Sequence, residues 1–227
     1  MATFSDLGIS KSYIKALKEL NIISPTKIQE AVIPTLLETK TDLIGLAQTG
    51  TGKTAAFGLP LLNAIDANKA EVQGLIIAPT RELVQQIKKQ LFKFTKYLDE
   101  PIFAEGVYGG EKITRQIKAL TRPTHIVVAT PGRLLDLIER GAVDITNVKT
   151  LVLDEADEML SMGFKEDLNR ILSYNKSKRN TWLFSATMPE EIKRIVKTYM
   201  SDNAIRVEIN KNALVNENIS HLFINTK

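Results

Sequence analysis

The hydrophobic and polar positions along the chain follow two alternating periods, and each period predicts one kind of element. Short apolar runs of β-branched and aliphatic residues predict strands covered on both faces. These runs lie at residues 42–47, 74–78, 102–107, 125–129, 150–153, 181–184 and 205–209. Apolar residues three and four apart predict helices at 12–20, 82–97, 112–120, 133–140, 165–172 and 190–200. Strand followed by helix, repeated along the chain, predicts a parallel sheet with right-handed crossovers.

A further helix is predicted to begin at Pro25, ahead of the first strand. Ser24 is placed as its N-cap, and proline suits the first helical position because its missing N–H has no intrahelical partner there. The polar segment 210–227 ends on a fresh apolar run, 219–224. This run fits either the start of a further element or a frayed terminus.

Composition narrows the class of protein. The chain has 227 residues, 44% hydrophobic and 25% charged, which is typical of one large globular domain. The absence of cysteine excludes disulfide scaffolds, thiol catalysis and cysteine-based metal sites. No stretch approaches the roughly 20 apolar residues of a membrane span, and the first ten residues lack the pattern of a signal peptide. We therefore expect a cytoplasmic protein with no membrane contact.

The net charge of +4 is an average over segments of opposite sign. Residues 81–122 carry nine basic and five acidic side chains, whereas residues 123–160 carry three basic and seven acidic ones. This alternation indicates a basic surface and an acidic site on one domain, although solvated helix faces of different charge explain it equally well.

The strongest chemical signal directly follows the first predicted strand and opens a helix. Gly50 and Gly52 allow the backbone to turn its N–H groups toward an anion, where the helix N-terminus adds its positive end. Lys53 would reach the β and γ phosphates of a nucleotide, and the Thr54 hydroxyl would bind Mg²⁺. The phosphate-binding loop is formed by Ala47, Gln48, Thr49, Gly50, Thr51, Gly52, Lys53 and Thr54. Ala47 stands where this motif usually has its first glycine.

An acidic group ends the strand at 150–153. Asp154 is the predicted partner of Mg²⁺, directly or through water, and Glu155 is the predicted general base that positions the attacking water. Together with Lys53 they form the predicted catalytic set. A solvated acidic turn is the alternative, and it is disfavoured because ligands of open α/β sheets bind at the carboxyl ends of the strands.

Four more polar loops follow predicted strands and should lie on the same edge of the sheet. They begin at Pro79, Tyr108, Thr130 and Ser185, and three of them offer hydroxyls, glycine amides or arginine. Such groups hold phosphates and sugars without reading bases. Each loop alone is ordinary turn chemistry, but together they indicate a polyanionic second ligand.

These motifs, in this order, resemble those of the first RecA-like domain of bacterial-type DEAD-box RNA helicases. Asp154, Glu155, Ala156 and Asp157 spell the family name, and residues 21–29 resemble its adenine-reading Q motif. Asn21 and Ile22 depart from the glycine and phenylalanine often found there. The resemblance implies an α/β fold of the RecA-like P-loop NTPase type, with a mostly parallel sheet flanked by helices on both faces.

The resemblance also implies roles for individual residues. It adds Phe4, Lys27 and Gln29 to the ATP-binding residues, with Phe4 stacking on adenine and Gln29 bonding its edge. Asp157, Ser185 and Thr187 would couple RNA binding to hydrolysis. Contacts to the RNA sugar-phosphate backbone are implied for Pro79, Thr80, Arg81, Gly109, Gly110, Thr130, Pro131, Gly132 and Arg133.

The implied organisation has three parts: residues 1–30 as a helical extension with the Q motif, 31–209 as the first RecA-like domain, and 210–227 as the start of a linker. A second RecA-like domain would follow in cis, and without it we expect weak ATP binding and little hydrolysis. ATP and Mg²⁺ are the expected cofactors. RNA is the expected partner, and the resemblance adds ribosome-assembly or RNA-decay proteins as possible partners.

Three rival functions are weighed on the same residues. The first is a P-loop ATPase that separates DNA strands, and the second is a nucleic-acid-binding module without turnover. The third, a kinase or GTPase, is weakened because Phe4 and Gln29 favour adenine and no guanine-reading Asn-Lys-x-Asp follows the acidic strand. His125 and Trp182 are interpreted as structural, and Arg115, Lys118 and Arg122 as a solvated helix face.

Overall fold

The computed structural model describes residues 2–174 and 179–209. The predicted linker at 210–227 and its apolar run at 219–224 lie outside the described residues. All seven predicted strands are confirmed. They are β1 (Leu43–Leu46), β2 (Gly74–Ile77), β3 (Ala104–Val107), β4 (Ile126–Ala129), β5 (Thr150–Leu153), β6 (Asn180–Ser185) and β7 (Ile205–Glu208).

The strands form one sheet in the order β3-β4-β2-β5-β6-β1-β7. Every pairing between neighbours in this sheet is parallel. The order places β1 and β5, which precede the phosphate-binding loop and the acidic motif, on either side of β6. All carboxyl ends of parallel strands lie on one edge, so the predicted loops share that edge.

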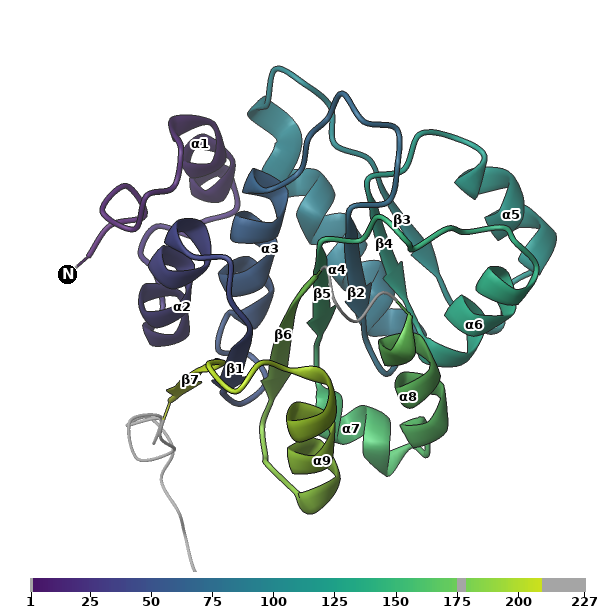
Figure 1. The fold of residues 1–227 in the computed structure, drawn as a ribbon. Coiled ribbons are helices and arrows are strands. Elements are labelled where there is room, and N and C mark those ends of the chain that lie inside the picture. The colour runs from purple at the N-terminus through teal and green to yellow at the C-terminus, as the bar shows by residue number, and fades with distance from the viewer. Residues whose placement is uncertain (1, 175–178, 210–227) are drawn as a thin grey trace, which may run out of the picture.

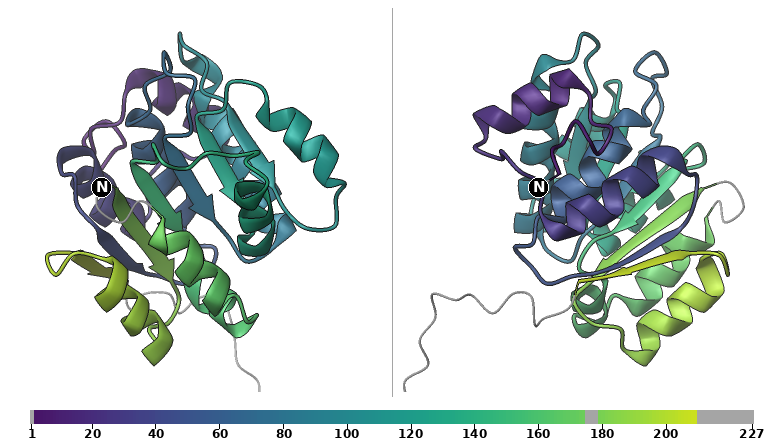
Figure 2. Two further views of the ribbon diagram at one scale, coloured as in Figure 1. Left: turned by 45° about the vertical axis from the view of Figure 1, so that its right-hand side comes forward. Right: turned by 90° about the vertical axis from the view of Figure 1, so that its left-hand side faces the viewer.

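Helices cover both faces of the sheet (Figures 1 and 2). The described helices are α1 (Lys11–Glu19), α2 (Lys27–Glu38), α3 (Lys53–Asn63), α4 (Arg81–Phe94), η1 (Thr95–Tyr97), α5 (Ile113–Leu120), α6 (Pro131–Glu139), α7 (Ala156–Ser161), α8 (Lys165–Ser173) and α9 (Glu190–Tyr199). Buried side chains of α1 to α4 form one core, and those of α6 to α9 form the other. The predicted α/β fold, with a parallel sheet between two helical layers, is confirmed.

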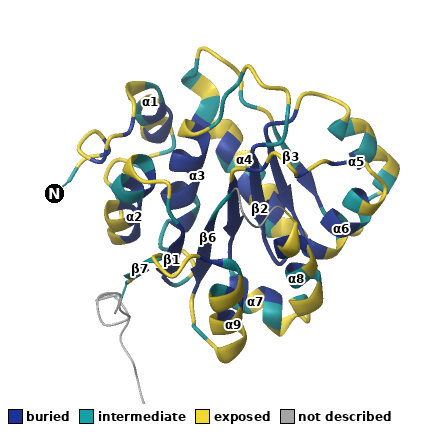
Figure 3. Cartoon of the chain, in the orientation of Figure 1, coloured by how far each residue is buried: buried dark blue, intermediate teal, exposed yellow. Residues whose placement is uncertain are grey.

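Alternation along each strand divides its side chains between these two cores. On β5, Val152 packs with α1 to α4, whereas Leu151 and Leu153 face the opposite layer. All four residues of β5 are buried, as the continuous apolar run predicts for a covered strand. Figure 3 shows the buried strands at the centre and the exposed residues on the outer sides of the helices.

The predicted start of the second helix is wrong. Helix α2 begins at Lys27 with Thr26 as its N-cap, so Ser24 and Pro25 precede it. Thr26 and Gln29 form a capping box, in which the backbone N–H of Thr26 donates to Oε1 of Gln29 at 3.0 Å. This reciprocal cap outweighs the preference of proline for the first turn. Since α2 runs past residue 30, the extension at 1–30 and the segment 31–209 share a helix.

Other boundaries differ by smaller amounts. Helix α6 begins at Pro131 rather than at Arg133, because Thr130 is extended and proline takes the first helical position. The helix predicted at 82–97 is α4 followed by the 3₁₀ turn η1. The short helix α7 was not predicted, because its six residues are too few for a periodic pattern to stand out.

Two residues interpreted as structural are buried in the described structure. Trp182 is 3% exposed in the α1–α4 core, and its indole N–H donates to the carbonyl of Thr41 at 3.2 Å. His125 is 2% exposed, and its Nδ1 accepts a hydrogen bond from the backbone N–H of Phe103 at 3.0 Å. Within the described ranges, no helix is long and apolar enough to cross a bilayer.

Candidate functional site

The phosphate-binding loop connects the buried strand β1 to α3. Gly50 and Gly52 have left-handed backbone angles, with φ of 78° and 91°, which side chains with a Cβ rarely adopt. A Cβ on Gly52 would also lie 2.5 Å from Nε2 of Gln29. Both positions therefore favour glycine because of their backbone conformation, and position 52 also has no room for a Cβ. Helix α3 starts at Lys53, as predicted, with its N-terminus at the end of the loop.

The Q-motif segment holds this loop through two hydrogen bonds to its backbone. The Thr26 hydroxyl donates to the carbonyl of Thr51 at 2.8 Å, and Nε2 of Gln29 donates to the carbonyl of Gly52 at 3.0 Å. Gln29 is 3% exposed, so its amide is fixed by these contacts and by the cap of α2. Any ligand that binds Gln29 would therefore also contact the segment that shapes the phosphate loop.

Phe4 and Lys27 occupy different environments. Phe4 is 2% exposed and packs in the α1–α4 core, whereas Lys27 is exposed at the first position of α2. The adenine contacts of Phe4, Lys27 and Gln29 stay predictions.

A buried charge pair lies between the loop and the acidic motif. Nζ of Lys53 donates to the carbonyl of Ala47 at 3.3 Å and is 3.9 Å from Oδ1 of Asp154. Both side chains are almost fully buried, at 6% and 3% exposed. The separation is too long for a hydrogen bond, and Oδ1 of Asp154 has no hydrogen-bond partner among the described residues.

The environment of Asp154 suits a cation. Burial raises the pKa of its carboxyl to about 6, and the positive charge of Lys53 opposes that rise. A buried oxygen without a partner is costly, and a bound Mg²⁺ would satisfy it. The described residues contain no group of three His, Cys, Asp or Glu side chains that could hold a metal ion by themselves. One carboxylate, the Thr54 hydroxyl, nucleotide phosphates and water would suit Mg²⁺, which keeps several non-protein ligands.

Glu155 adopts a strained backbone conformation beside this pair. Its φ of 54° and ψ of 50° are left-handed, which is uncommon for a residue other than glycine. Such outliers persist where the surrounding structure imposes them, and they concentrate at functional sites. Only Asp154 and Glu155 separate the end of β5 from the start of α7, so Glu155 lies at the carboxyl edge of the sheet.

The third acidic residue of the motif is joined to the loop after β6. Oδ2 of Asp157 accepts hydrogen bonds from the backbone N–H of Thr187 at 2.9 Å and from its hydroxyl at 2.7 Å. The backbone N–H of Asp157 donates to Oγ of Ser185 at 3.3 Å. Burial favours a higher pKa for Asp157, but these hydrogen bonds outweigh it and lower the pKa below its usual value. The predicted coupling residues are therefore in direct contact.

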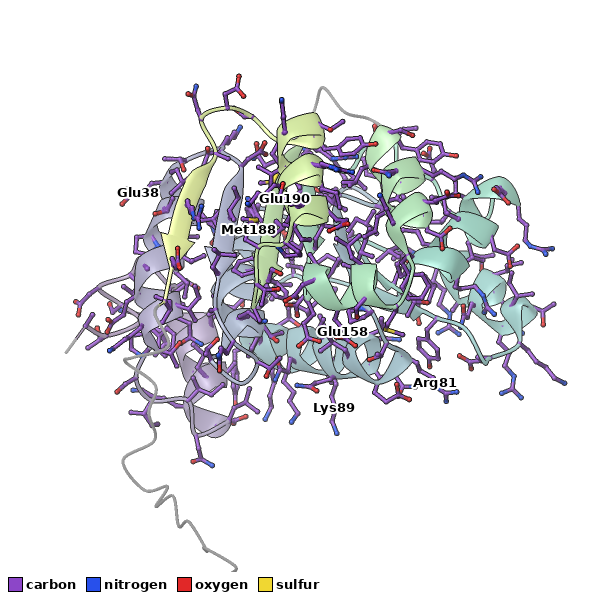
Figure 4. The ribbon with its side chains drawn as sticks, turned by 90° about the horizontal axis from the view of Figure 1, so that it is seen from below. Glu38, Arg81, Lys89, Glu158, Met188 and Glu190 are labelled. Atoms are coloured by element: carbon purple, nitrogen blue, oxygen red, sulfur yellow. The ribbon has the colours of Figure 1, made fainter. Side chains whose placement is uncertain are left out.

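The predicted RNA-contacting residues also lie on the carboxyl edge of the sheet. Thr80 is the N-cap of α4, and its Oγ1 accepts from the N–H of Leu83 at 3.2 Å. Arg81 is exposed, and its guanidinium lies over the ring of Tyr108 at 5.1 Å from the centroid. Figure 4 views the molecule from below Figure 1 and labels Arg81 and Lys89 along α4.

The remaining loops combine exposed backbone with one tethered arginine. Gly109 and Gly110 are exposed, and Gly110 has a φ of 80°. Thr130 and Pro131 are buried at the start of α6, and Gly132 is exposed beside them. Nη1 of Arg133 donates to the carbonyl of Glu111 at 3.1 Å and to Oε1 of Gln116 at 2.9 Å. The structure thus places all nine predicted residues on one edge, and RNA contact itself stays a prediction.

Sequence reasoning missed Gln116. This glutamine interrupts the apolar spacing of Ile113, Ile117 and Leu120 on α5, and it is 3% exposed. A polar residue on the apolar side of a short helix was the available signal.

The sequence matches the family model described as DEAD/DEAH box helicase over residues 26–195. The chain belongs to this family. A DEAD-box ATP-dependent RNA helicase CshA from Bacillus cereus is 50% identical over 202 residues, covering 89% of this chain and 38% of that protein. CshA from Streptococcus pneumoniae is 47% identical over 224 residues, covering 99% of this chain and 42% of that protein. The chain therefore spans less than half the length of these curated relatives.

Solved structures agree with this assignment. The crystal structure of a DEAD box protein from the hyperthermophile Methanococcus jannaschii has a TM-score of 0.87 and 39% identity, covering 93% of this chain and 57% of that one. The yeast DEAD-box splicing factor Prp28 has a TM-score of 0.81 and 34% identity, covering 88% and 50%. The sheet and its helical layers are therefore the RecA-like fold of a DEAD-box domain, as the resemblance implied.

Proposed function

We propose that this chain is the first RecA-like domain of an ATP-dependent RNA helicase. It binds ATP and Mg²⁺ at the carboxyl edge of its sheet, contacts the RNA backbone beside them, and takes part in hydrolysis that drives local duplex separation. The observation that carries the proposal is the buried Oδ1 of Asp154, which lies 3.9 Å from Nζ of Lys53 and has no hydrogen-bond partner in the part of the chain that the structure describes. A cation bound together with the nucleotide would contact this oxygen and compensate for its missing hydrogen bond.

The roles of the chain's own residues follow from their positions. Lys53 would neutralise phosphate charge, Thr54 and Asp154 would hold Mg²⁺, and Glu155 would accept a proton from the attacking water. The metal, when bound, would neutralise negative charge that develops on the phosphates. An ammonium has three N–H donors, so Lys53 can contact the phosphates while it keeps its 3.3 Å hydrogen bond to the carbonyl of Ala47.

We further propose the domain organisation given by the resemblance, in which a second RecA-like domain follows residues 210–227 in the same polypeptide. Curated relatives more than twice as long as this chain support this proposal. Partners in ribosome assembly or RNA decay, and a cytoplasmic location, belong to the same proposal.

The primary experiment measures ATP hydrolysis with and without RNA, for residues 1–227 alone and for the chain joined to its second domain. We expect RNA to stimulate turnover in the two-domain protein and to have little effect on the isolated chain, because half of the nucleotide site would be missing. Brisk RNA-dependent turnover by residues 1–227 alone would refute the incomplete-site proposal.

A second comparison separates RNA from DNA as the stimulating polymer. Single-stranded RNA and DNA of equal length and composition are added to the two-domain protein at the same ionic strength. The proposal predicts stimulation by RNA well above that by DNA. Equal stimulation would favour a P-loop ATPase that acts on DNA strands.

A further inference from the structure

Gln116 is buried on α5 among apolar neighbours, where a glutamine needs a reason. It is the buried residue of this helix, at 3% exposed, while the apolar residues Ile113 and Ile117 beside it are only partly buried. An amide removed from water costs free energy unless its donors and acceptor are bonded. The partners of this side chain therefore explain its burial.

Both ends of the Gln116 amide are used, and they reach two different loops. Its Nε2 donates to the carbonyl of Tyr108 at 3.0 Å and to Oε2 of Glu111 at 3.3 Å. Its Oε1 accepts from Nη1 of Arg133 at 2.9 Å. Arg133 completes the ring by donating to the carbonyl of Glu111 at 3.1 Å. One side chain thus fixes both ends of the Gly109–Gly110 turn to the first turn of α6.

Tyr108 extends these contacts to helix α4. Its hydroxyl accepts from Nε2 of Gln85 at 2.8 Å, and the Arg81 guanidinium lies over its ring. The turn that Gln116 anchors therefore also supports the arginine at the start of α4. The three loops with proposed RNA contacts are joined by one set of contacts in which Gln116 is the buried member.

We propose that Gln116 is a positioning residue for RNA binding. It holds the Gly109–Gly110 turn and Arg133 in the arrangement that receives the RNA backbone, without contacting the RNA itself. The proposal rests on the proposed function, since it assumes that these loops bind RNA. Arg133 also helps to hold the turn, because its Nη1 donates to the carbonyl of Glu111 and to Oε1 of Gln116.

The test measures binding of a fluorescein-labelled 12-nucleotide oligouridylate to the full chain by anisotropy. Gln116→Leu is expected to weaken RNA binding about tenfold, since it removes three partly buried hydrogen bonds that order the turn. Gln116→Glu keeps an acceptor for Arg133 but places a carboxylate against the carbonyl of Tyr108 and the carboxylate of Glu111, so it should also weaken RNA binding. Gln86→Leu makes the same chemical change at an exposed position of α4 and should leave binding unchanged.

Comparing the affinity for RNA with the affinity for nucleotide separates a positioning role from a general loss of stability, which would lower both. The affinity of each variant for a fluorescent ATP analogue should stay within twofold of the parent chain, while RNA affinity falls. Amide hydrogen exchange at residues 108–111 should speed up in Gln116→Leu, with no change in the loop at 47–52. Parallel losses of RNA and nucleotide affinity would overturn the positioning role.

A double-mutant cycle tests whether Gln116 acts through Arg133. If it does, Gln116→Leu combined with Arg133→Met should bind RNA about as weakly as the weaker single variant. If the fold-losses in RNA affinity of the two single variants multiply in the double variant, Gln116 does not act through Arg133. If Gln116→Leu does not fold, Gln116→Glu carries the same test.

The two proposals fail in different ways. No saturable binding of the oligouridylate by the parent chain would count against RNA as the ligand of these loops. Parent binding that Gln116→Leu and Gln116→Glu leave intact would overturn the inference about Gln116 alone.

Discussion

The proposed nucleotide site, at residues 47–54 and 154–155, and the proposed RNA-facing loops, at residues 79–81, 108–111 and 130–133, lie on the same edge of the sheet but are built on opposite principles. At the nucleotide edge, Asp154 is buried with an oxygen that has no hydrogen-bond partner among the described residues. In the RNA-facing loops, the buried amide of Gln116 is bonded at both ends, and exposed glycines and Arg81 face solvent. A buried oxygen without a hydrogen bond, such as Oδ1 of Asp154, favours binding of one specific ligand. A buried amide whose hydrogen bonds are complete, such as that of Gln116, instead fixes a surface that can bind a polymer of any sequence.

The largest effect that separates the two regions should come from Glu155→Gln. It removes the predicted base and keeps the size of the side chain, so ATP hydrolysis by the two-domain protein should fall at least about 100-fold. Affinity for ATP and RNA should change less than about threefold. Glu158→Gln is the matched control, because Glu158 is exposed on α7, the helix that Glu155 precedes as N-cap (Figure 4). Unchanged turnover in Glu155→Gln would contradict its role as the base, and no measurable turnover in the parent two-domain protein would support a binding module without catalysis.

Sequence alone predicted the framework of both regions but not their internal contacts. The apolar runs identified all the strands of the described residues, and β1, β2, β4 and β5 are buried throughout because they are covered on both faces. The loops then followed from the rule that ligands bind at the carboxyl ends of parallel strands. The capping of α2 was mispredicted: Thr26 and Gln29 have the spacing of a capping box, but only the structure shows that this pair, rather than Ser24 and Pro25, begins the helix.

The role of Gln116 could not be read from sequence for a similar reason. Its partners are 17 residues away at Arg133 and eight away at Tyr108, and only the fold brings them within hydrogen-bonding distance. Periodicity reports which face of a helix is buried, but it does not report which loop a buried amide will meet. Long-range polar contacts are therefore the part of this site that required the structure.

A second prediction concerns the glycines of the phosphate loop. Gly52→Ala should destabilise the chain by about 2 kcal/mol or more, since it combines a left-handed backbone with a Cβ 2.5 Å from Nε2 of Gln29. It should also abolish measurable binding of the ATP analogue. Gly50→Ala has the same backbone strain, with nothing within 4 Å of its Cβ, and should cost about 1 kcal/mol. Urea denaturation measures both costs, and equal values would contradict the proposed clash.

A third prediction addresses the RNA-facing loops. Arg81→Ala should weaken binding of oligouridylate about tenfold and reduce the salt dependence of log Kd by about one unit, as expected for loss of one phosphate contact. Lys89→Ala removes a positive charge from an exposed position two turns further along α4 and should have little effect (Figure 4). Equal losses for both variants would indicate attraction to a general basic surface.

A fourth prediction concerns Asp157, whose carboxylate accepts hydrogen bonds from the loop after β6. Its pKa is lowered in the folded chain, so its ionised form contributes stability above the unfolded pKa, near 3.8, and that contribution is lost as pH falls below this value. Asp157→Asn should therefore cost about 1 kcal/mol at pH 7 and less at pH 3. Thr187→Val should reduce the same pH dependence by removing the 2.7 Å hydrogen bond. A cost that stays constant from pH 7 to pH 3 would contradict this account.

The smallest expected effect lies away from both regions, at the amino end of β4. Burial lowers the pKa of His125, and its Nδ1 accepts from the N–H of Phe103, a bond that protonation would break. The unfolded chain therefore binds more protons than the folded chain below about pH 6.5, and stability should decrease as pH falls from 7 to 5. His125→Gln should flatten this decrease by less than about 1 kcal/mol in urea titrations. ATP and RNA affinity should not change, and His221→Gln, which removes the other histidine, provides the control. A change in ligand affinity in His125→Gln would show that the two regions extend further into the domain than the contacts at the carboxyl edge indicate.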